Sequence, residues 1–107
     1  MVSIRLNERA GGVVSIGIGL IGLGRHGSRY ATHLLDDSIP RARLTAICRR
    51  NRAEGASFAD RHALRFHEDY RALIADPAVH AIVVVTPPAL TPQISLEAVR
   101  ARKAMLI

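Results

Sequence analysis

Glycine is concentrated in one short part of this chain, and this restricts what that part can form. Seven of the eight glycines lie between Gly11 and Gly27. Within this segment, residues 15–21 are a short apolar run bounded by glycine, the pattern of a strand buried on both faces. Glycine directly after such a strand favours a tight turn, because it adopts backbone angles that other residues avoid. The segment therefore predicts a buried strand followed by a close turn.

Apolar runs and helical patterns alternate along the rest of the chain. The expected strands span residues 15–21, 44–48, 64–67, 81–85 and 104–107, and the expected helices span residues 25–36, 51–62, 68–75 and 91–101. Asn51, Asp69 and Thr91 are suited to cap helices, with Pro92 at a first helical position. The side chains expected to point inward are Tyr30, Ala31, Leu34, Leu35, Ala53, Ala56, Ala59, Tyr70, Leu73, Ile74, Ile94, Ala98 and Ala101.

This alternation with short connections predicts parallel strands joined by right-handed crossovers. The expected fold is a Rossmann-type, doubly wound α/β sheet with strand order 3-2-1-4-5 and helices on both faces. In such a sheet the ligand crevice lies at the carboxyl ends of strands one and four. At 107 residues the chain has the size of one domain, which we expect over residues 15–107 after a flexible leader at residues 1–14.

Composition argues against several classes of protein. A hydrophobic fraction of 49% with 22% charged residues rules out a disordered tail. No run approaches the ~20 apolar residues of a membrane span, and the single cysteine excludes an internal disulfide, so we expect a cytoplasmic protein with no membrane partner. The net charge of +6 raises the question of nucleic acid. Because the arginines are scattered among acidic residues and aromatics are only 4%, we expect no nucleic-acid partner.

Two overlapping G-x-G-x-x-G registers occur in the glycine-rich segment, one starting at Gly17 and one at Gly22. Only the second has a full strand before it and a helix-forming stretch after it. In that register Gly22 permits the tight turn, Gly24 lets the backbone approach a pyrophosphate, and Gly27 lets the helix pack on the strand. The helix dipole then faces the anion. The alternative is a buried glycine-rich strand with a flexible turn.

The tip of the second strand indicates which dinucleotide would bind. Domains that bind a dinucleotide through this glycine motif usually carry an acidic residue at the tip of the second strand. Its carboxylate accepts hydrogen bonds from the adenosine ribose hydroxyls. Here Cys48 is followed by Arg49 and Arg50. A carboxylate would repel a 2′-phosphate, whereas paired arginine N–H donors bind one. The two arginines therefore predict NADP(H) rather than NAD(H); the alternative is that both are solvated residues of an arginine-rich surface.

Four motifs, in order, resemble those of a known family. They are Ile18-Gly-Leu-Ile-Gly-Leu-Gly-Arg-His-Gly27, Leu44-Thr-Ala-Ile-Cys48, Phe66-His-Glu-Asp-Tyr70 with Leu73 and Asp76-Pro77, and Ile82-Val-Val-Val-Thr-Pro-Pro88. Together they resemble the Gfo/Idh/MocA oxidoreductases, the relatives of glucose-fructose oxidoreductase and inositol dehydrogenase, over residues 15–107. The resemblance implies an NAD(P)-binding domain.

The resemblance also implies a set of cofactor-binding residues. These are Gly22, Gly24, Arg25, His26 and Gly27 at the pyrophosphate, Arg49 and Arg50 at the adenosine ribose, and Thr86 and Pro87 at the ribose nearer the nicotinamide. The chain departs from the family pattern at three positions. Arg49 replaces the usual acid at the tip of strand two, Thr91 replaces the His often found three residues after Thr-Pro-Pro, and Arg102 replaces the usual Gly before Lys103. The first departure alters the choice of cofactor, and the second removes one typical contact.

In the family, strand five leads into a Glu-Lys-Pro motif and a second α/β domain that supplies the substrate pocket. Because the sequence ends at Ile107, the resemblance implies a truncated or isolated cofactor domain without that substrate domain. We expect it to bind the dinucleotide of an oxidoreductase of sugar- or polyol-like compounds, and to meet a small-molecule substrate only if a C-terminal domain is present. The alternative is a non-enzymatic nucleotide-binding or interaction module. The oligomeric state, a homo-oligomer included, stays open.

No residue of this sequence is assigned a catalytic or metal-binding role. His62 and His67 lack the spacing of metal ligands. Cys48 is expected to be a small buried hydrophobic side chain rather than a nucleophile. Lys103, at the start of the fifth strand, is expected at the surface and is not the family's catalytic lysine.

The second glycine register makes a prediction about Gly24. The substitution Gly24→Val places a branched side chain where the phosphates would lie, so we expect nucleotide binding to be lost. Calorimetric titration of the purified variant with NADPH and NADH measures this. Undiminished binding would show that the phosphates lie elsewhere.

Overall fold

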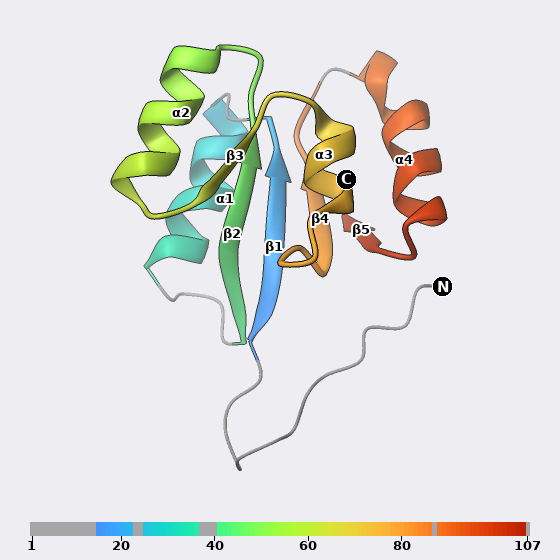
Figure 1. The fold of residues 1–107 in the computed structure, drawn as a ribbon, viewed down its shortest axis with the longest axis horizontal. Coiled ribbons are helices and arrows are strands. Elements are labelled where there is room, and N and C mark those ends of the chain that lie inside the picture. Colours follow the sequence, from blue (N-terminus) through green and yellow to red (C-terminus); the bar gives the residue numbers. More distant parts are fainter. Residues whose placement is uncertain (1–14, 23–24, 37–40, 87, 107) are drawn as a thin grey trace.

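The computed structural model of the chain describes residues 15–22, 25–36, 41–86 and 88–106, with the backbone alone at residues 25–28 and 88. The predicted leader, Gly24 and Pro87 lie outside the described residues. The fold is a parallel sheet of five strands in the order β3-β2-β1-β4-β5 (Figure 1). The predicted doubly wound α/β class and its strand order are confirmed.

The order of helices and strands also agrees with the sequence pattern. The strands are β1 (Ile16–Ile21), β2 (Ala42–Cys48), β3 (Arg65–His67), β4 (Ala81–Val84) and β5 (Ala104–Leu106). The helices are α1 (Arg25–Leu35), α2 (Arg52–Arg61), α3 (Tyr70–Ala75) and α4 (Thr91–Arg100), with the 3₁₀ turn η2 (Pro88–Leu90) directly before α4. Each connection between strands carries a helix, as a parallel sheet requires.

Apolar side chains form two cores (Figure 1). Side chains of α1 and α2 contribute to the first core, and side chains of α3 and α4 contribute to the second. The first core contains Ile18, Leu20, Ala31, Leu34, Leu44, Ile47 and Ala59. The second contains Ile21, Ala46, Cys48, Leu73, Ile74, Val79, Ile82, Val84, Ile94 and Ala98. Because the strands contribute to both cores, their sequences are nearly continuous apolar runs.

Two glycines inside β1 allow the connection between α3 and β4 to lie directly on the sheet. A Cβ atom at Gly19 would lie 2.7 Å from Leu73 and 2.9 Å from Val79, and one at Gly17 would collide with the carbonyl oxygen of Ala78. Real Cβ atoms do not approach other atoms so closely, so a larger residue at either position would push this connection away. The glycines of β1 thus serve close packing.

Helix α2 begins as predicted but presents a different face to the sheet. Asn51 is its N-cap and accepts a hydrogen bond from the backbone N–H of Glu54 at 3.1 Å. The expected inward residues Ala53 and Ala56 are exposed, whereas Gly55 and Ala59 are buried. Gly55 lies against the ring of Phe66 on β3, a contact that a Cβ atom would obstruct. The need for this close approach, which no alanine pattern reveals, sets the rotation of the helix.

Two other helices differ from prediction in detail. Tyr30 of α1 was expected inward but is 42% exposed, while Ala31 and Leu34 are buried as expected. Thr91 is not a cap: Leu90 precedes α4, with no side-chain cap hydrogen bond, because η2 runs straight into the helix. Ala101 follows α4 and is exposed. Of the residues expected to point inward from this helix, Ile94 and Ala98 are buried and Ala101 is not.

A buried carboxylate directly after α3, that of Asp76, joins several elements. Asp76, whose side chain is 2% exposed, accepts hydrogen bonds from Arg65 at 2.7 Å, from the backbone N–H of Ala78 at 2.9 Å, and pairs with His67 at 2.8 Å. The Nζ of Lys103 donates to the carbonyl oxygen of Asp76 at 2.6 Å. Lys103 is thus half-buried rather than on the surface, contrary to the sequence expectation, and this burial lowers its pKa.

The Asp76 contacts predict how stability depends on pH. Burial raises the pKa of this carboxyl, but the hydrogen bonds from His67 and Ala78 and the charge of Arg65 outweigh burial, so the pKa lies below its ordinary value of 3.8. The native state therefore binds this proton less tightly than the unfolded chain does. The resulting stabilisation is complete above the ordinary pKa and is lost as the pH falls through the folded-state pKa.

We expect Asp76→Asn to lower the free energy of unfolding at pH 7 by about 2 kcal/mol, because the group that accepts from Arg65 loses its negative charge and one of its two acceptor oxygens. Urea denaturation at a series of pH values from 7 into the acid range measures the loss and its decline as Asp76 becomes protonated. Asp60→Asn, which removes an exposed carboxylate from α2, is the control and is expected to change stability by less than about 0.5 kcal/mol. A loss that stays equal across the whole acid series would contradict this account of Asp76.

Cys48, at the end of β2, is a buried thiol, as predicted. It is 7% exposed, and its Sγ donates to the carbonyl oxygen of Glu68 at 3.6 Å. Burial, together with the nearby charge of Asp69, raises the pKa of the thiol from 9.0 to about 11. Because the thiolate is the reactive form, this position is a poor nucleophile.

The raised pKa predicts slow labelling of the native protein. At pH 8 a thiol with a pKa of about 11 is about a hundredfold less ionised than one at 9.0, so reaction with a disulfide reagent such as DTNB should slow at least in proportion. The rate in the folded chain is compared with the rate in guanidinium chloride, where the only cysteine of the sequence is exposed. Rapid, stoichiometric labelling of the folded chain would contradict the burial of Cys48.

Candidate functional site

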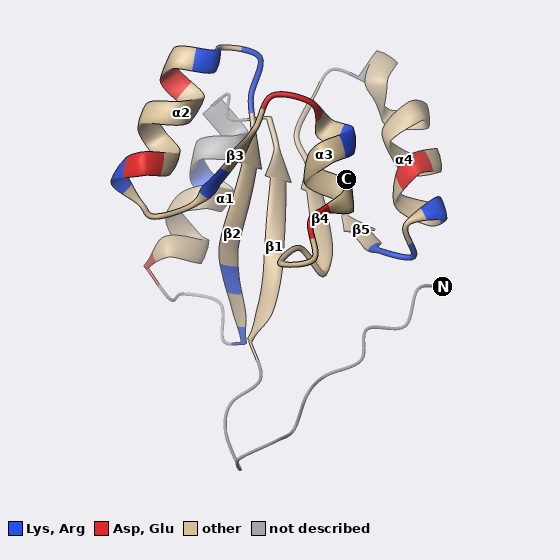
Figure 2. Cartoon of the chain, in the orientation of Figure 1, with Lys and Arg blue, Asp and Glu red and all other residues tan. Residues whose placement is uncertain are grey.

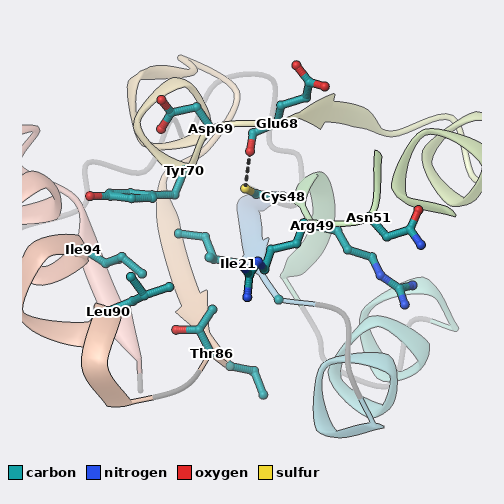
Figure 3. A pocket seen from close by; sticks show the side chains of 13 residues that line it. Ile21, Cys48, Arg49, Asn51, Glu68, Asp69, Tyr70, Thr86, Leu90 and Ile94 are labelled. Atoms are coloured by element: carbon teal, nitrogen blue, oxygen red, sulfur yellow. Dashed lines mark hydrogen bonds between the residues drawn. The ribbon is translucent and has the colours of Figure 1, made fainter. Parts of the chain in front are cut away.

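The carboxyl ends of the central strands enclose a cavity of about 640 Å³, here called the edge cavity. It is lined by Ile21, Gly22, Cys48, Arg49, Arg50, Asn51, Glu68, Asp69, Tyr70, Val85, Thr86, Leu90 and Ile94. Figure 3 shows Arg49 and Asn51 on one side, Tyr70, Leu90 and Ile94 on the other, and Thr86 between them. The cavity therefore lies where the sequence predicted the crevice of a doubly wound sheet.

Gly22 joins three strand ends at the floor of the edge cavity. Its φ of +96° is accessible mainly to glycine. Its N–H donates to the carbonyl oxygen of Cys48 at 2.9 Å, and a Cβ atom here would collide with the carbonyl oxygen of Val85. Gly22 therefore has the backbone conformation that the predicted tight turn requires, and its contacts hold the ends of β1, β2 and β4 together.

The bounds of β1 and α1 match the second glycine register. Gly17 and Gly19 lie inside β1, whereas Gly22 follows its last residue and α1 begins at Arg25. Residues 25–27, which include three of the predicted cofactor-binding residues, form the first turn of this helix. The N-terminus of α1 thus lies three residues after Gly22 in the sequence, the spacing that dinucleotide-binding domains use for anions.

Two buried hydroxyl groups in the lining residues lack a partner among the residues that the structure describes. They are the Oη of Tyr70 and the Oγ1 of Thr86. The ring of Tyr70 spans from α3 towards α4, and the guanidinium of Arg71 lies 4.7 Å from its centre (Figure 3). Buried hydroxyls normally find a hydrogen-bond partner, so the unpaired Thr86 and Tyr70 suit a cavity that receives a polar ligand.

Opposite charges flank the edge cavity. Arg49 and Arg50 follow β2 and Arg52 begins α2, whereas Glu68 and Asp69 follow β3; Figure 2 shows the basic stretch in blue and the acidic stretch in red. Arg52 and Glu68 join the two stretches with an ion pair of 3.0 Å, and Asp69 caps α3 as predicted, accepting from the N–H of Arg71 at 2.8 Å. The basic side is the one suited to a phosphate group.

Arg49 is held by a carboxylate from α2. Its Nη2 lies 2.5 Å from Oε2 of Glu54, and the two side chains are 31% and 57% exposed. Arg49 also lines a second cavity of about 520 Å³, here called the helix cavity, together with Ala53, Glu54, Ser57, Phe58 and Arg61. The guanidinium thus lies between the two cavities, while Glu54 borders the helix cavity.

The structure brings four of the predicted cofactor-binding residues to the edge cavity, namely Gly22, Arg49, Arg50 and Thr86. Gly24 and Pro87 lie outside the described residues, as do the side chains of Arg25 and His26. Sequence reasoning missed Leu90, Glu68 and the ion pair of Arg49. Tyr70 and Ile94 were predicted as core residues only, because an inward helical position does not distinguish a core from a cavity wall.

The described residues contain neither a membrane-spanning helix nor a cluster of metal-binding side chains. None of the described helices is long and apolar enough to cross a membrane. Among these same residues, no three or more His, Cys, Asp or Glu side chains are placed to hold a metal ion. His67 pairs with Asp76, and the ring of His62 lies tilted against the ring of Phe58, with 4.6 Å between the ring centres.

Comparison with known proteins agrees with this geometry. Residues 16–107 match the Gfo/Idh/MocA family, described as an oxidoreductase family with an NAD-binding Rossmann fold. The chain is 34% identical over 86 residues to the uncharacterized oxidoreductase YrbE of Bacillus subtilis, covering 79% of this chain and 25% of that protein. The chain therefore spans about a quarter of the length of this relative.

Solved structures show the same likeness. Scyllo-inositol dehydrogenase from Lactobacillus casei superposes with a TM-score of 0.79 at 26% identity, over 87% of this chain and 28% of that one. Its structure with bound NAD(H) and scyllo-inositol gives a TM-score of 0.77 at 27% identity, over 85% and 27%. KijD10, a 3-ketoreductase from Actinomadura kijaniata in complex with NADP, gives 0.74 at 30% identity, over 86% and 28%. The chain belongs to the Gfo/Idh/MocA oxidoreductase family, as its NAD-binding Rossmann domain.

Proposed function

We propose that the edge cavity binds NADP(H) in preference to NAD(H). The observation that carries this proposal is the pair Arg49 and Arg50, which line the cavity at the tip of β2 where related domains usually place an acid. Guanidinium groups bind phosphate through paired N–H donors, and the 2′-phosphate is the group that distinguishes the two dinucleotides. One related structure holds NADP and another NAD(H), so the family accommodates either cofactor.

The described residues fit a dinucleotide. A volume of about 640 Å³ is ordinary for a small-molecule or cofactor site. Ile21, Val85, Leu90 and Ile94 offer apolar contacts, and the unpaired hydroxyl of Thr86 offers a polar one. The basic side and the apolar side lie opposite each other (Figure 3), which suits a molecule with a charged ribose phosphate at one point and flat rings elsewhere.

Each proposed residue has a part in holding the cofactor. The turn at Gly22 and Gly24 and the first turn of α1, with Arg25, His26 and Gly27, would bind the pyrophosphate through backbone N–H groups and the helix dipole. Arg49 and Arg50 would bind the adenosine ribose and its phosphate, and Thr86 and Pro87 the ribose nearer the nicotinamide. When bound, the nicotinamide supplies hydride transfer, which is the chemistry of the cofactor.

The reaction of the whole protein is a further part of the proposal. Because the related structures include an inositol dehydrogenase and a 3-ketoreductase, we infer oxidation or reduction of a sugar- or polyol-like compound. This chain covers 27% and 28% of those two structures, and residues that select the substrate are not assigned within it. The chain by itself is expected to bind the dinucleotide without turning over a substrate.

Titration with the two cofactors tests the choice between them. We expect the purified chain to bind NADPH at least about tenfold more tightly than NADH, since one charge-assisted contact contributes that much. Arg50→Ala should weaken NADPH binding by about tenfold. Arg49→Ala should weaken it less, by about fivefold, because the Arg49 guanidinium is already paired with Glu54, and both variants should leave NADH within twofold.

Arg100→Ala is the matched control, because Arg100 is an exposed residue of α4 that pairs with Glu97 outside both cavities. It removes the same charge and is expected to change neither affinity. Equal or tighter binding of NADH by the unmodified chain would overturn the NADP(H) assignment.

A further inference from the structure

We propose that Glu54 is a selectivity residue, which weakens NADP(H) binding by holding the Arg49 guanidinium. The proposal rests on the proposed binding of NADP(H) and assigns a role to a residue outside the edge cavity. Glu54 lines the helix cavity and not the edge cavity, and its carboxylate lies 2.5 Å from Nη2 of Arg49. The guanidinium that should receive a 2′-phosphate is therefore already paired with a carboxylate.

The ion pair affects both the charge and the donors of Arg49. A guanidinium binds a phosphate strongly when two neighbouring N–H groups point at it and its charge is uncompensated. Glu54 engages Nη2, so it occupies one of the paired-donor edges and neutralises the charge that would attract the phosphate. A 2′-phosphate must compete with Glu54 for Arg49, and part of the binding free energy is spent on this exchange. NADH carries a hydroxyl at that position and does not need the exchange.

Glu54 is not required as a helix cap. The cap of α2 runs from Oδ1 of Asn51 to the backbone N–H of Glu54, so it survives replacement of the Glu54 side chain. In a full capping box the carboxylate would reach back to the N–H of Asn51. In the described part of the chain it contacts Arg49 instead, so its orientation is set by the arginine and not by the helix end.

Arg50 differs from Arg49 in this respect. It is exposed, lines the edge cavity and forms no ion pair with any carboxylate that the structure describes. The two arginines are therefore unequal: Arg50 is available to a phosphate, whereas Arg49 becomes available only when Glu54 releases it. The balance between the two cofactors then depends on Glu54 as well as on the residues of the cavity.

The substitution Glu54→Gln tests the proposal. It keeps the size of the side chain and removes its charge, so we expect NADPH to bind about fivefold more tightly while NADH stays within twofold, both measured by calorimetric titration. Glu97→Gln is the matched control, because Glu97 pairs with Arg100 on α4 and its loss changes the net charge equally. It is expected to leave the ratio of the two affinities unchanged.

A second comparison asks whether Glu54 acts through Arg49. In the Arg49→Ala background, Glu54→Gln should no longer improve NADPH binding, because no guanidinium remains to be released. An unchanged NADPH-to-NADH ratio in the single variant, or a gain that persists without Arg49, would overturn the proposal. If Arg49→Ala weakens NADPH but Glu54→Gln has no effect, NADP(H) binding stands and the role of Glu54 falls. If neither arginine variant affects NADPH, the proposed function itself fails.

Discussion

The close approach of β1 to its neighbours is the constraint on which the rest of the fold depends. β1 lies at the centre of the sheet, and Gly17 and Gly19 provide the space in which the connection from α3 to β4 lies against it. Because this connection lies close, β4 pairs with β1, and the ends of both strands reach the same edge as the end of β2. Gly22, directly after β1, lies equally close to the carbonyl oxygen of Val85 after β4. The edge cavity therefore lies at the end of β1, beside the ends of β2 and β4.

The edge strands need a different kind of support. β3 and β5 have only three residues each, which leaves few ladder hydrogen bonds to hold them. Asp76 joins both to the centre, since its carboxylate binds Arg65 and His67 of β3 and its carbonyl oxygen binds Lys103, just before β5. Such a buried carboxylate is stable only with all its partners in place, so the short strands and the α3–β4 connection are ordered together.

The charge at the rim of the edge cavity differs in sign from one part to another. The basic stretch after β2 and the acidic stretch after β3 lie on its rim, and the apolar residues of η2 and α4 line its other side. A phosphate is attracted to one part of this rim and repelled by another. The ion pair between Arg49 and Glu54 shows that an arginine at a strand tip is not by itself a free cation, since its strength as a phosphate ligand depends on which carboxylates share it.

Four features of this protein could be predicted from its amino-acid sequence: the order of helices and strands, the sheet topology, the caps at Asn51 and Asp69, and the strand ends that line the cavity. These depend on hydrophobic periodicity, on local hydrogen bonds and on the handedness of crossovers, all of which act over short stretches of chain. Other features emerge only from the packing of the elements: which face α2 presents, the half-buried position of Lys103 on Asp76, the place of Tyr70 and Ile94 at a cavity wall, and the pairing of Glu54 with Arg49. Each of these depends on how one element is rotated against another that is distant in sequence, and small residues such as Ala53 and Gly55 leave no periodic signal from which that rotation could be predicted.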